Sequence, residues 1–220
     1  DLFIKFRFRD WIINSIMVSL GTMIFTVLLS TVSSYVFSRF VFKGKSLTFQ
    51  VILLIQIFPV TLSMVAIHRV VSMLGLLNTR ISLILVNTVM ALPYSILLSK
   101  GYFDTIPRDI EESAYMDGAG KARTLWSIIL PLVKPIVATT AINSFVLAYN
   151  EYVIANVLMT GGFKSVPLAV GLQSMSAGQF GINWPRFAAA SLLGSLPMLL
   201  IFILFQDYFI SGTTEGSLKE

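Results

Sequence analysis

The 220-residue sequence contains no cysteine, and only 12% of its residues are charged. The first absence excludes disulfides, thiolate metal sites and cysteine nucleophiles. The second argues against an ordinary soluble domain, because such domains carry about 25% charged residues. Histidine is nearly absent as well. The single one, His68, stands at a predicted helix end, where an interfacial polar role outweighs a proton relay.

Apolar residues take the place of the missing charge. They make up 55% of the chain, and the mean hydropathy is +0.81. Lysines and arginines at the ends of membrane helices account for the net charge of +5, which therefore indicates membrane topology and not nucleic-acid binding. We expect one all-α, multi-pass membrane domain over residues 1–220, located in the cell (plasma or inner) membrane.

Five runs of low charge are long enough to cross a hydrocarbon core of about 30 Å as helices. The first lacks any charged residue, and its many small polar residues indicate close packing inside a helix bundle. A shorter helix is expected over residues 168–175, inside a glycine- and serine-rich external loop over residues 158–185. The expected spans are residues 11–38, 46–67, 81–99, 135–157 and 187–206.

One long polar interval, residues 106–135, interrupts these apolar runs. It holds Asp109, Glu111, Glu112 and Asp117, with apolar residues at helical spacing and prolines near both ends. This pattern predicts a short pair of helices outside the bilayer. With five spans, nine of the sixteen basic residues fall on the side of this interval and seven on the other, which favours a cytoplasmic location.

A glycine-rich segment of the interval, Gly118-Ala-Gly120-Lys121, is similar to part of a phosphate-binding loop. The full pattern fails, because position 115 is Tyr and Ala122 stands where a magnesium-binding Ser or Thr is needed. We therefore expect no ATP hydrolysis by this chain, and no cofactor or metal bound to it.

The same interval contains a motif of fixed spacing: Glu112-Ser113-Ala114, then Gly118, then Ile128-x-Leu130-Pro131. It resembles the E-A-A-x3-G-x9-I-x-L-P loop of the membrane subunits of binding-protein-dependent ABC importers. Every spacing matches, and Ser113 in place of the first alanine is the departure within the motif.

Other segments are similar to the carbohydrate branch of that family. Phe145 with Tyr149-Asn150-Glu151-Tyr152 resembles its F-x3-W-N-E-F segment, with Tyr149 replacing Trp. The ending from Gly212 to Lys219 is similar to the G-L-T-A-G-A-V-K tail of maltose/trehalose-type permease subunits. These motifs stand in the family's order, so the resemblance covers nearly the whole chain.

The resemblance implies a permease subunit that forms half of the translocation pathway of an ATP-driven sugar importer. ATP and magnesium would bind two partner ATPase subunits, whose clefts receive the cytoplasmic loop over residues 106–131. The other implied partners are a second permease subunit in a heterodimer, an extracytoplasmic sugar-binding protein and membrane lipid. The implied ATPase-coupling residues are Glu111, Glu112, Ser113, Ala114, Asp117, Gly118, Ala119, Ile128, Leu130 and Pro131.

Physical roles can be assigned to several of these residues. Ser113 and Ala114 keep the helix surface low, so that a partner's cleft can close around it. Gly118 permits either a turn conformation or a close backbone approach. Pro131 is expected to begin the following membrane helix, where its missing N–H is harmless. A re-entrant or solvated helix pair without a partner is the alternative to a docking element.

The resemblance also implies that a cytoplasmic tail, residues 211–220, reaches the ATPase. It further implies that the external loop contacts the solute-binding protein, with an ordinary flexible loop as the alternative. Six spans are usual in the family, so we expect a further helix upstream of the five. The residues of these two expected contacts are Gly212, Gly216 and Lys219 in the tail, and Gly161, Gly162, Phe163 and Lys164 in the loop.

Polar side chains inside the spans are candidates for lining a sugar path or gate, since amides both donate and accept hydrogen bonds. Hydrogen bonding between helices is the more common use of such amides. For the carboxylate, a gating or substrate role and simple solvation of a helix end are equal alternatives. The candidates are Gln56, Asn87, Asn143, Asn150 and Glu151.

Other functions remain as alternatives. An importer permease for a non-sugar solute would carry the same coupling motif. An ion-coupled secondary transporter would need ionisable residues within the spans, where Glu151 is almost alone. A membrane-embedded enzyme would need a nucleophile–base pair or a metal cluster, and the sequence suggests neither.

Overall fold

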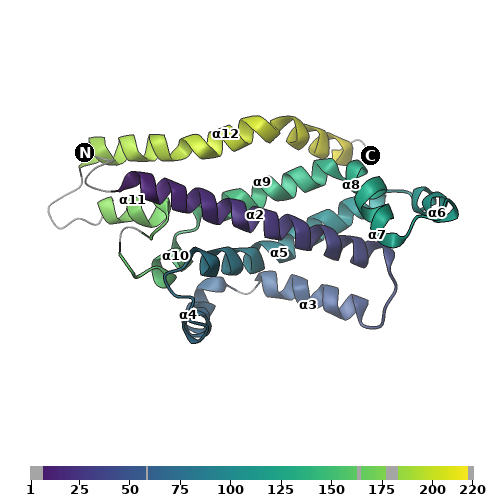
Figure 1. Cartoon of the computed structure of the whole chain (residues 1–220), viewed down its shortest axis with the longest axis horizontal. Helices are drawn as coiled ribbons and strands as arrows, with labels where there is room; N and C mark the ends of the chain where they lie inside the picture. Colours follow the sequence, from purple (N-terminus) through teal and green to yellow (C-terminus); the bar gives the residue numbers. More distant parts are fainter. Residues whose placement is uncertain (1–6, 58, 163–164, 177–182, 218–220) are drawn as a thin grey trace.

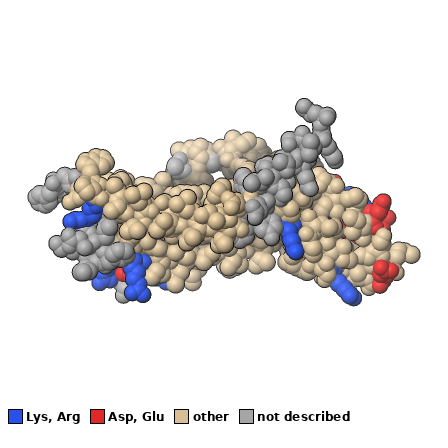
Figure 2. All heavy atoms as spheres, turned by 90° about the horizontal axis from the view of Figure 1, so that it is seen from above, with Lys and Arg blue, Asp and Glu red and all other residues tan. Residues whose placement is uncertain are grey.

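The computed structural model describes residues 7–57, 59–162, 165–176 and 183–217, and within these ranges all the regular structure is helical. The long helices lie alongside one another (Figure 1). Charged side chains gather toward the two ends of the molecule, with a largely uncharged band between them (Figure 2). This arrangement confirms the expected all-α membrane bundle, because a hydrocarbon core tolerates few charges.

Among the described residues, three helices are long and apolar enough to cross a membrane: α2 (Phe8–Arg39), α5 (Arg80–Thr105) and the first part, Trp184–Leu204, of α12 (Trp184–Ser217). At 1.5 Å per residue, the 32 residues of α2 extend about 48 Å, more than the thickness of a hydrocarbon core. α12 runs past its expected end at residue 206, so the backbone of the expected tail continues the helix as far as Ser217.

The expected second span, residues 46–67, is interrupted. α3 (Lys45–Ile57) ends before Pro59, a 3-10 helix η1 (Val60–Ser63) follows, and α4 (Met64–Met73) continues the chain. Pro59 lacks the N–H that a continuous helix needs, and its backbone is extended. α4 lies at the end of the bundle opposite α6 (Figure 1). The segment is therefore a broken helix, and not the one continuous span expected over residues 46–67.

The expected fourth span, residues 135–157, is also divided. α9 (Lys134–Asn150) carries Pro135 in its first turn, where a missing N–H costs nothing. α10 (Val153–Leu158) follows after a short break. The helical segment Lys121–Leu132 precedes α9 and meets it at 82°, and this bent pair is a fourth candidate for a span.

The polar interval forms two helical pieces at one end of the molecule, as expected. The first is α6 (Asp109–Met116). The second consists of α7 (Lys121–Arg123), the π-helix η2 (Thr124–Ile129) and α8 (Leu130–Leu132). The short helix expected over residues 168–175 is α11 (Leu168–Ser176), at the opposite end (Figure 1).

α2 packs against both α5 and α9 and so occupies the middle of the bundle. Close approach explains its small residues. A Cβ added to Gly21 would lie 2.6 Å from the Ile84 side chain, and Ser34 Oγ donates to the Ile96 carbonyl at 3.1 Å. The packing expected from composition is confirmed. The buried hydroxyl residues along α2 include Ser15, Ser19, Thr22, Thr26, Ser30 and Ser34.

Candidate coupling site and transport path

α6 and the turn after it form a polar projection at one end of the molecule (Figure 1). The acidic residues Asp109, Glu111 and Glu112 lie in the first turn of α6, where negative charge is favoured by the helix dipole. Gly118 ends the piece with φ +82°, and a Cβ built on it would contact nothing within 4 Å. Of the two roles expected for Gly118, the structure therefore supports the turn and not a close approach within this chain.

Two of the ten predicted coupling residues face the chain's own bundle. Glu111 is 4% exposed and Ala114 is 6% exposed, because their three-residue spacing places both on the inner face of α6. The expectation that Ala114 lowers an outer docking surface is therefore wrong. Among the other coupling residues, Ala119, Ile128 and Leu130 are partly buried. Exposed coupling residues are Glu112, Ser113, Asp117, Gly118 and Pro131.

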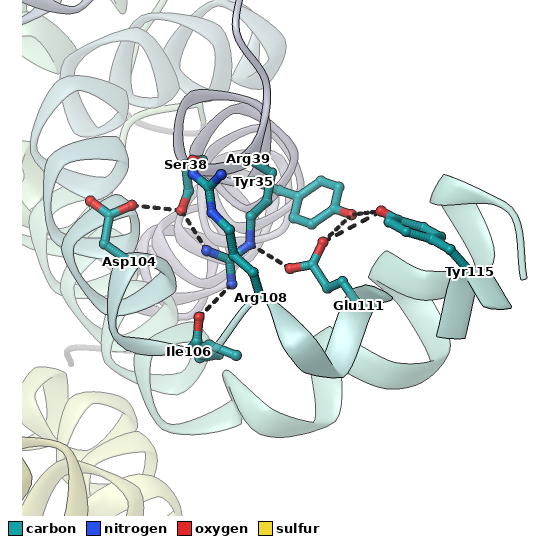
Figure 3. Close-up of polar contacts among 8 residues, drawn as sticks. All are labelled: Tyr35, Ser38, Arg39, Asp104, Ile106, Arg108, Glu111 and Tyr115. Atoms are coloured by element: carbon teal, nitrogen blue, oxygen red, sulfur yellow. Dashed lines mark hydrogen bonds and ion pairs between the residues drawn. The ribbon is translucent and has the colours of Figure 1, made fainter. Parts of the chain in front are cut away.

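The Glu111 carboxylate lies at the centre of a polar cluster between α6 and the last turn of α2 (Figure 3). Arg39 Nε donates to Glu111 Oε1 in an ion pair whose side chains are 8% and 5% exposed. Tyr35 Oη donates to Glu111 Oε2 at 3.0 Å, and Tyr115 Oη donates to the same oxygen at 3.5 Å. Sequence reasoning missed Tyr35 and Arg39, because no local spacing relates the end of α2 to residue 111.

The second helical piece is fixed by apolar packing. Leu125 and Ile129 are buried against Phe103 and Tyr35, in a cluster that also includes Val133 and Ile136. The apolar face expected along this piece is therefore present. Pro131 lies inside it, in α8, and Pro135 is the proline at the start of the membrane helix α9. The expected position of Pro131 is wrong because the chain turns by 82° only after Leu132.

The segment that is similar to a phosphate-binding loop, residues 118–121, contributes to the chain's own structure. Gly118 forms the turn, and Gly120 is the residue before α7, with an extended backbone. The Lys121 ammonium lies over the Phe40 ring, 4.5 Å from its centroid. Such a cation–π contact holds Lys121 against the residue that follows α2.

Apolar side chains are exposed beside the acidic ones. Met116 is 89% exposed, Trp126 is 45% exposed and Tyr115 is 39% exposed. Acidic side chains are visible at this end of the molecule (Figure 2). Sequence reasoning did not single out Met116 or Trp126. Both residues stand next to the motif in a segment expected outside the bilayer, and this position could have indicated that their side chains are exposed to a partner.

Two of the predicted path residues meet at one cavity. Gln56 and Asn143 line a space of about 310 Å³ together with Tyr94, Ser95 and Ser144. Asn87 is separate from it: the side chain is 1% exposed, and its Oδ1 has no hydrogen-bond partner among the described residues. The sequence had not indicated Tyr94, which follows Pro93 inside α5.

The remaining two path candidates make local contacts. Asn150 Nδ2 donates to the Val146 carbonyl at 3.0 Å. The Glu151 carboxylate accepts from the backbone N–H groups of Ile154 at 2.6 Å and Ala155 at 2.9 Å, which caps the start of α10. This geometry favours a role for Glu151 at the helix end over a gating or substrate role.

The external loop and the tail are described only in part. The Gly161 N–H donates to Asn78 Oδ1 at 2.5 Å, and Gly162 has φ +98°. Gly212 and Gly216 lie within the helical backbone of α12. Phe163, Lys164 and Lys219 lie outside the described residues.

The chain is a multi-pass helical bundle, and its E-S-A…G…I-x-L-P segment forms two helical pieces joined by the turn at Gly118. These features define a class of membrane transport components. The chain belongs to the family of inner membrane components of binding-protein-dependent transport systems, whose model matches residues 5–214. It is accordingly a membrane transport subunit located in the inner membrane.

Curated relatives align along almost the whole chain. The sequence is 37% identical over 213 residues to the galactooligosaccharides transport system permease protein of Bacillus subtilis (strain 168), covering 97% of this chain and 75% of that protein. It is 32% identical over 213 residues to the trehalose/maltose transport system permease protein of Thermococcus litoralis (strain ATCC 51850 / DSM 5473 / JCM 8560 / NS-C), covering 97% and 76%.

Solved structures share the fold. A bacterial ABC transporter involved in the import of the acidic polysaccharide alginate matches with a TM-score of 0.80 at 23% identity, covering 92% of this chain and 75% of that one. The inward-facing MetNI methionine ABC transporter matches with a TM-score of 0.64 at 16% identity, covering 90% and 92%. The helices therefore follow the arrangement of ABC importer permeases.

Proposed function

We propose that this chain is a permease subunit of an ATP-driven sugar importer and forms half of its translocation pathway. A second permease subunit would supply the other half, and an extracytoplasmic sugar-binding protein would deliver the substrate. The curated relatives support the substrate class, because their names specify galactooligosaccharides and trehalose or maltose.

The exposed face of α6 is the proposed docking surface for an ATPase subunit. Glu112 and Asp117 supply negative charge there, and Met116 supplies an apolar side chain that is 89% exposed. This exposure, together with that of Tyr115 and Trp126, is the observation that carries the proposal, since a group of exposed apolar side chains beside charged ones is typical of a protein contact. A basic cleft with an apolar floor would complement it.

ATP hydrolysis is assigned to the partner. In the glycine-rich segment of this chain, Gly118 forms a turn and Lys121 contacts the Phe40 ring. Two ATPase subunits would bind ATP and magnesium and would move α6 as they close and open. The helix bundle would then alternate between inward- and outward-facing states.

The cavity lined by Gln56, Tyr94 and Asn143 is the proposed sugar-facing part of this chain. Amides satisfy hydroxyl groups as both donors and acceptors. An aromatic ring supplies a flat apolar surface for the C–H face of a pyranose. At the two ends of the path, the external loop around Gly161 would contact the binding protein, and the end of α12 near Gly212 would approach the ATPase.

Co-purification tests this assignment. The tagged chain, isolated from membranes of its own host, is expected to retain an ATPase whose activity rises when binding protein and oligosaccharides are added. Glu112→Lys should release the ATPase. Asp10→Lys makes the same charge change in the first turn of α2, at the end of the bundle far from α6, and should retain the ATPase. Retention of the ATPase by Glu112→Lys would contradict the docking surface. Stimulation by amino acids but not by sugars would favour a non-sugar solute.

A further inference from the structure

α6 has almost no apolar attachment to the bundle. Of its eight residues, all of them described, only Glu111 and Ala114 are buried. The neighbouring apolar cluster takes its buried residues from α2, α5 and the segment from Leu125 to Ile136, and none of them from α6. A helix that protrudes in this way needs another means of holding a fixed direction.

Polar contacts supply that attachment, and they reach α2 (Figure 3). Both carboxylate oxygens of Glu111 are used: Oε1 accepts from Arg39, and Oε2 accepts from Tyr35 at 3.0 Å. Tyr35 Oη also lies 3.3 Å from Tyr115 Oη, so α6 contributes a second side chain to the same contact. Arg39 and Tyr35 stand four residues apart and share one face of the last turn of α2.

Arg39 is held in turn by the ends of other elements. Its Nη2 donates to the Ile106 carbonyl at 2.9 Å, at the junction between α5 and α6. Its neighbour Ser38 donates through Oγ to Asp104 on α5 at 2.6 Å. The last turns of α2 and α5 and the first turn of α6 therefore form one hydrogen-bonded unit.

We propose that the buried Glu111–Arg39 pair, together with Tyr35, is the positioning link that carries displacement of the docked α6 into α2. α2 packs against α5 and α9, so a shift at its end reaches the helices that line the bundle. This inference rests on the proposed function, because it assumes that an ATPase moves α6.

The burial of the pair suits it to this role. An ion pair removed from water is costly to separate, because each charge would be left without compensation. The guanidinium also fixes direction as well as distance, since its N–H groups lie in a rigid plane. The nearby Lys100–Asp104 pair offers a contrast: its side chains are 24% and 44% exposed, and water can replace either partner.

The test uses the whole complex in nanodiscs, carrying either Glu111→Gln, Tyr35→Phe or no substitution in this chain. Asp10→Asn is the matched control, since it removes the acidic partner of an ion pair at the other end of α2. Two quantities are measured: hydrogen exchange of the α6 amides, and the number of sugar molecules transported per ATP hydrolysed.

Glu111→Gln is expected to retain the ATPase and to speed hydrogen exchange in α6. It should lower the transport ratio, the number of sugar molecules transported per ATP, by about two- to thirtyfold, the fold-change that corresponds to the coupling energies found in such networks. Tyr35→Phe should lower the ratio less, because it removes one hydroxyl. The double exchange Arg39→Glu with Glu111→Arg should recover part of the lost ratio, which a general folding defect would not allow.

An unchanged transport ratio in Glu111→Gln would overturn the link, whether or not α6 exchanges faster. So would a double exchange that binds the ATPase but recovers no coupling. If the unsubstituted complex contained no ATPase, the proposed function itself would fail and the link with it. That outcome is visible in the control preparation before any variant is compared.

Discussion

At the scale of single residues, the proposed coupling element contains two positions where a local rule is broken for a reason visible in three dimensions. Glu111 is a carboxylate with 4% of its surface exposed, in a motif that would otherwise be solvated. Its ion pair with Arg39 on α2 explains the burial. Gly118 has a backbone that L-residues rarely adopt, in a turn that sets the angle between α6 and α7.

Substitutions at Gly118 separate backbone strain from steric exclusion. A residue with a Cβ at φ +82° is expected to cost about 1–2 kcal/mol, and Asn is better tolerated there than Val. Gly118→Asn should therefore preserve the turn better than Gly118→Val in thermal unfolding of the purified complex. Gly118→Trp should in addition uncouple ATP hydrolysis from uptake, because its ring would enter the docking surface. Normal uptake by Gly118→Trp would show that nothing docks at this turn.

At the scale of elements, the chain breaks two helices that the sequence indicates as continuous spans. Pro59 separates α3 from the helices that follow it. After α9, the chain turns at Glu151, and this side chain bonds the first free N–H groups of α10. Such breaks leave backbone N–H groups without a helical partner, and here the Glu151 carboxylate accepts hydrogen bonds from them.

Glu151 should behave as a helix cap and not as a proton-dependent gate. Glu151→Ala is expected to destabilise the start of α10 by roughly 1 kcal/mol, the usual cost of a lost cap. Glu151→Gln keeps an acceptor oxygen and should transport at a rate near that of the unsubstituted chain. Uptake by both variants, measured together with thermal unfolding, checks this. Loss of uptake in Glu151→Gln with normal stability would instead indicate a gating role.

The sequence predicted elements well where a local pattern determines them. Charge-free runs located α2 and α5, and helical spacing in the polar interval located both pieces of the coupling loop. Prediction failed where distant residues decide. Nothing near Ala114 indicates that it faces inward, and the contact of Glu111 with Arg39 joins residues 72 positions apart. Tyr94 joins Gln56 and Asn143 only through the packing of separate helices.

At the scale of the whole molecule, the two ends of the bundle have different proposed roles. One end holds α6 with its acidic residues, and the other holds α10 and α11 (Figure 1). α2 connects them, with its first turn at one end and Arg39 beside Glu111 at the other. This arrangement suits a subunit that receives energy on one side of the membrane and substrate on the other.

Uptake by the complete complex in proteoliposomes tests the central claim most directly, namely that ATP hydrolysed by a partner drives sugar through this chain. Vesicles loaded with ATP, or with a non-hydrolysable analogue as the control, would receive binding protein and labelled oligosaccharide from outside. The account predicts uptake that requires hydrolysable ATP and persists when ionophores collapse proton and sodium gradients. Uptake without nucleotide that depends on either gradient would contradict it.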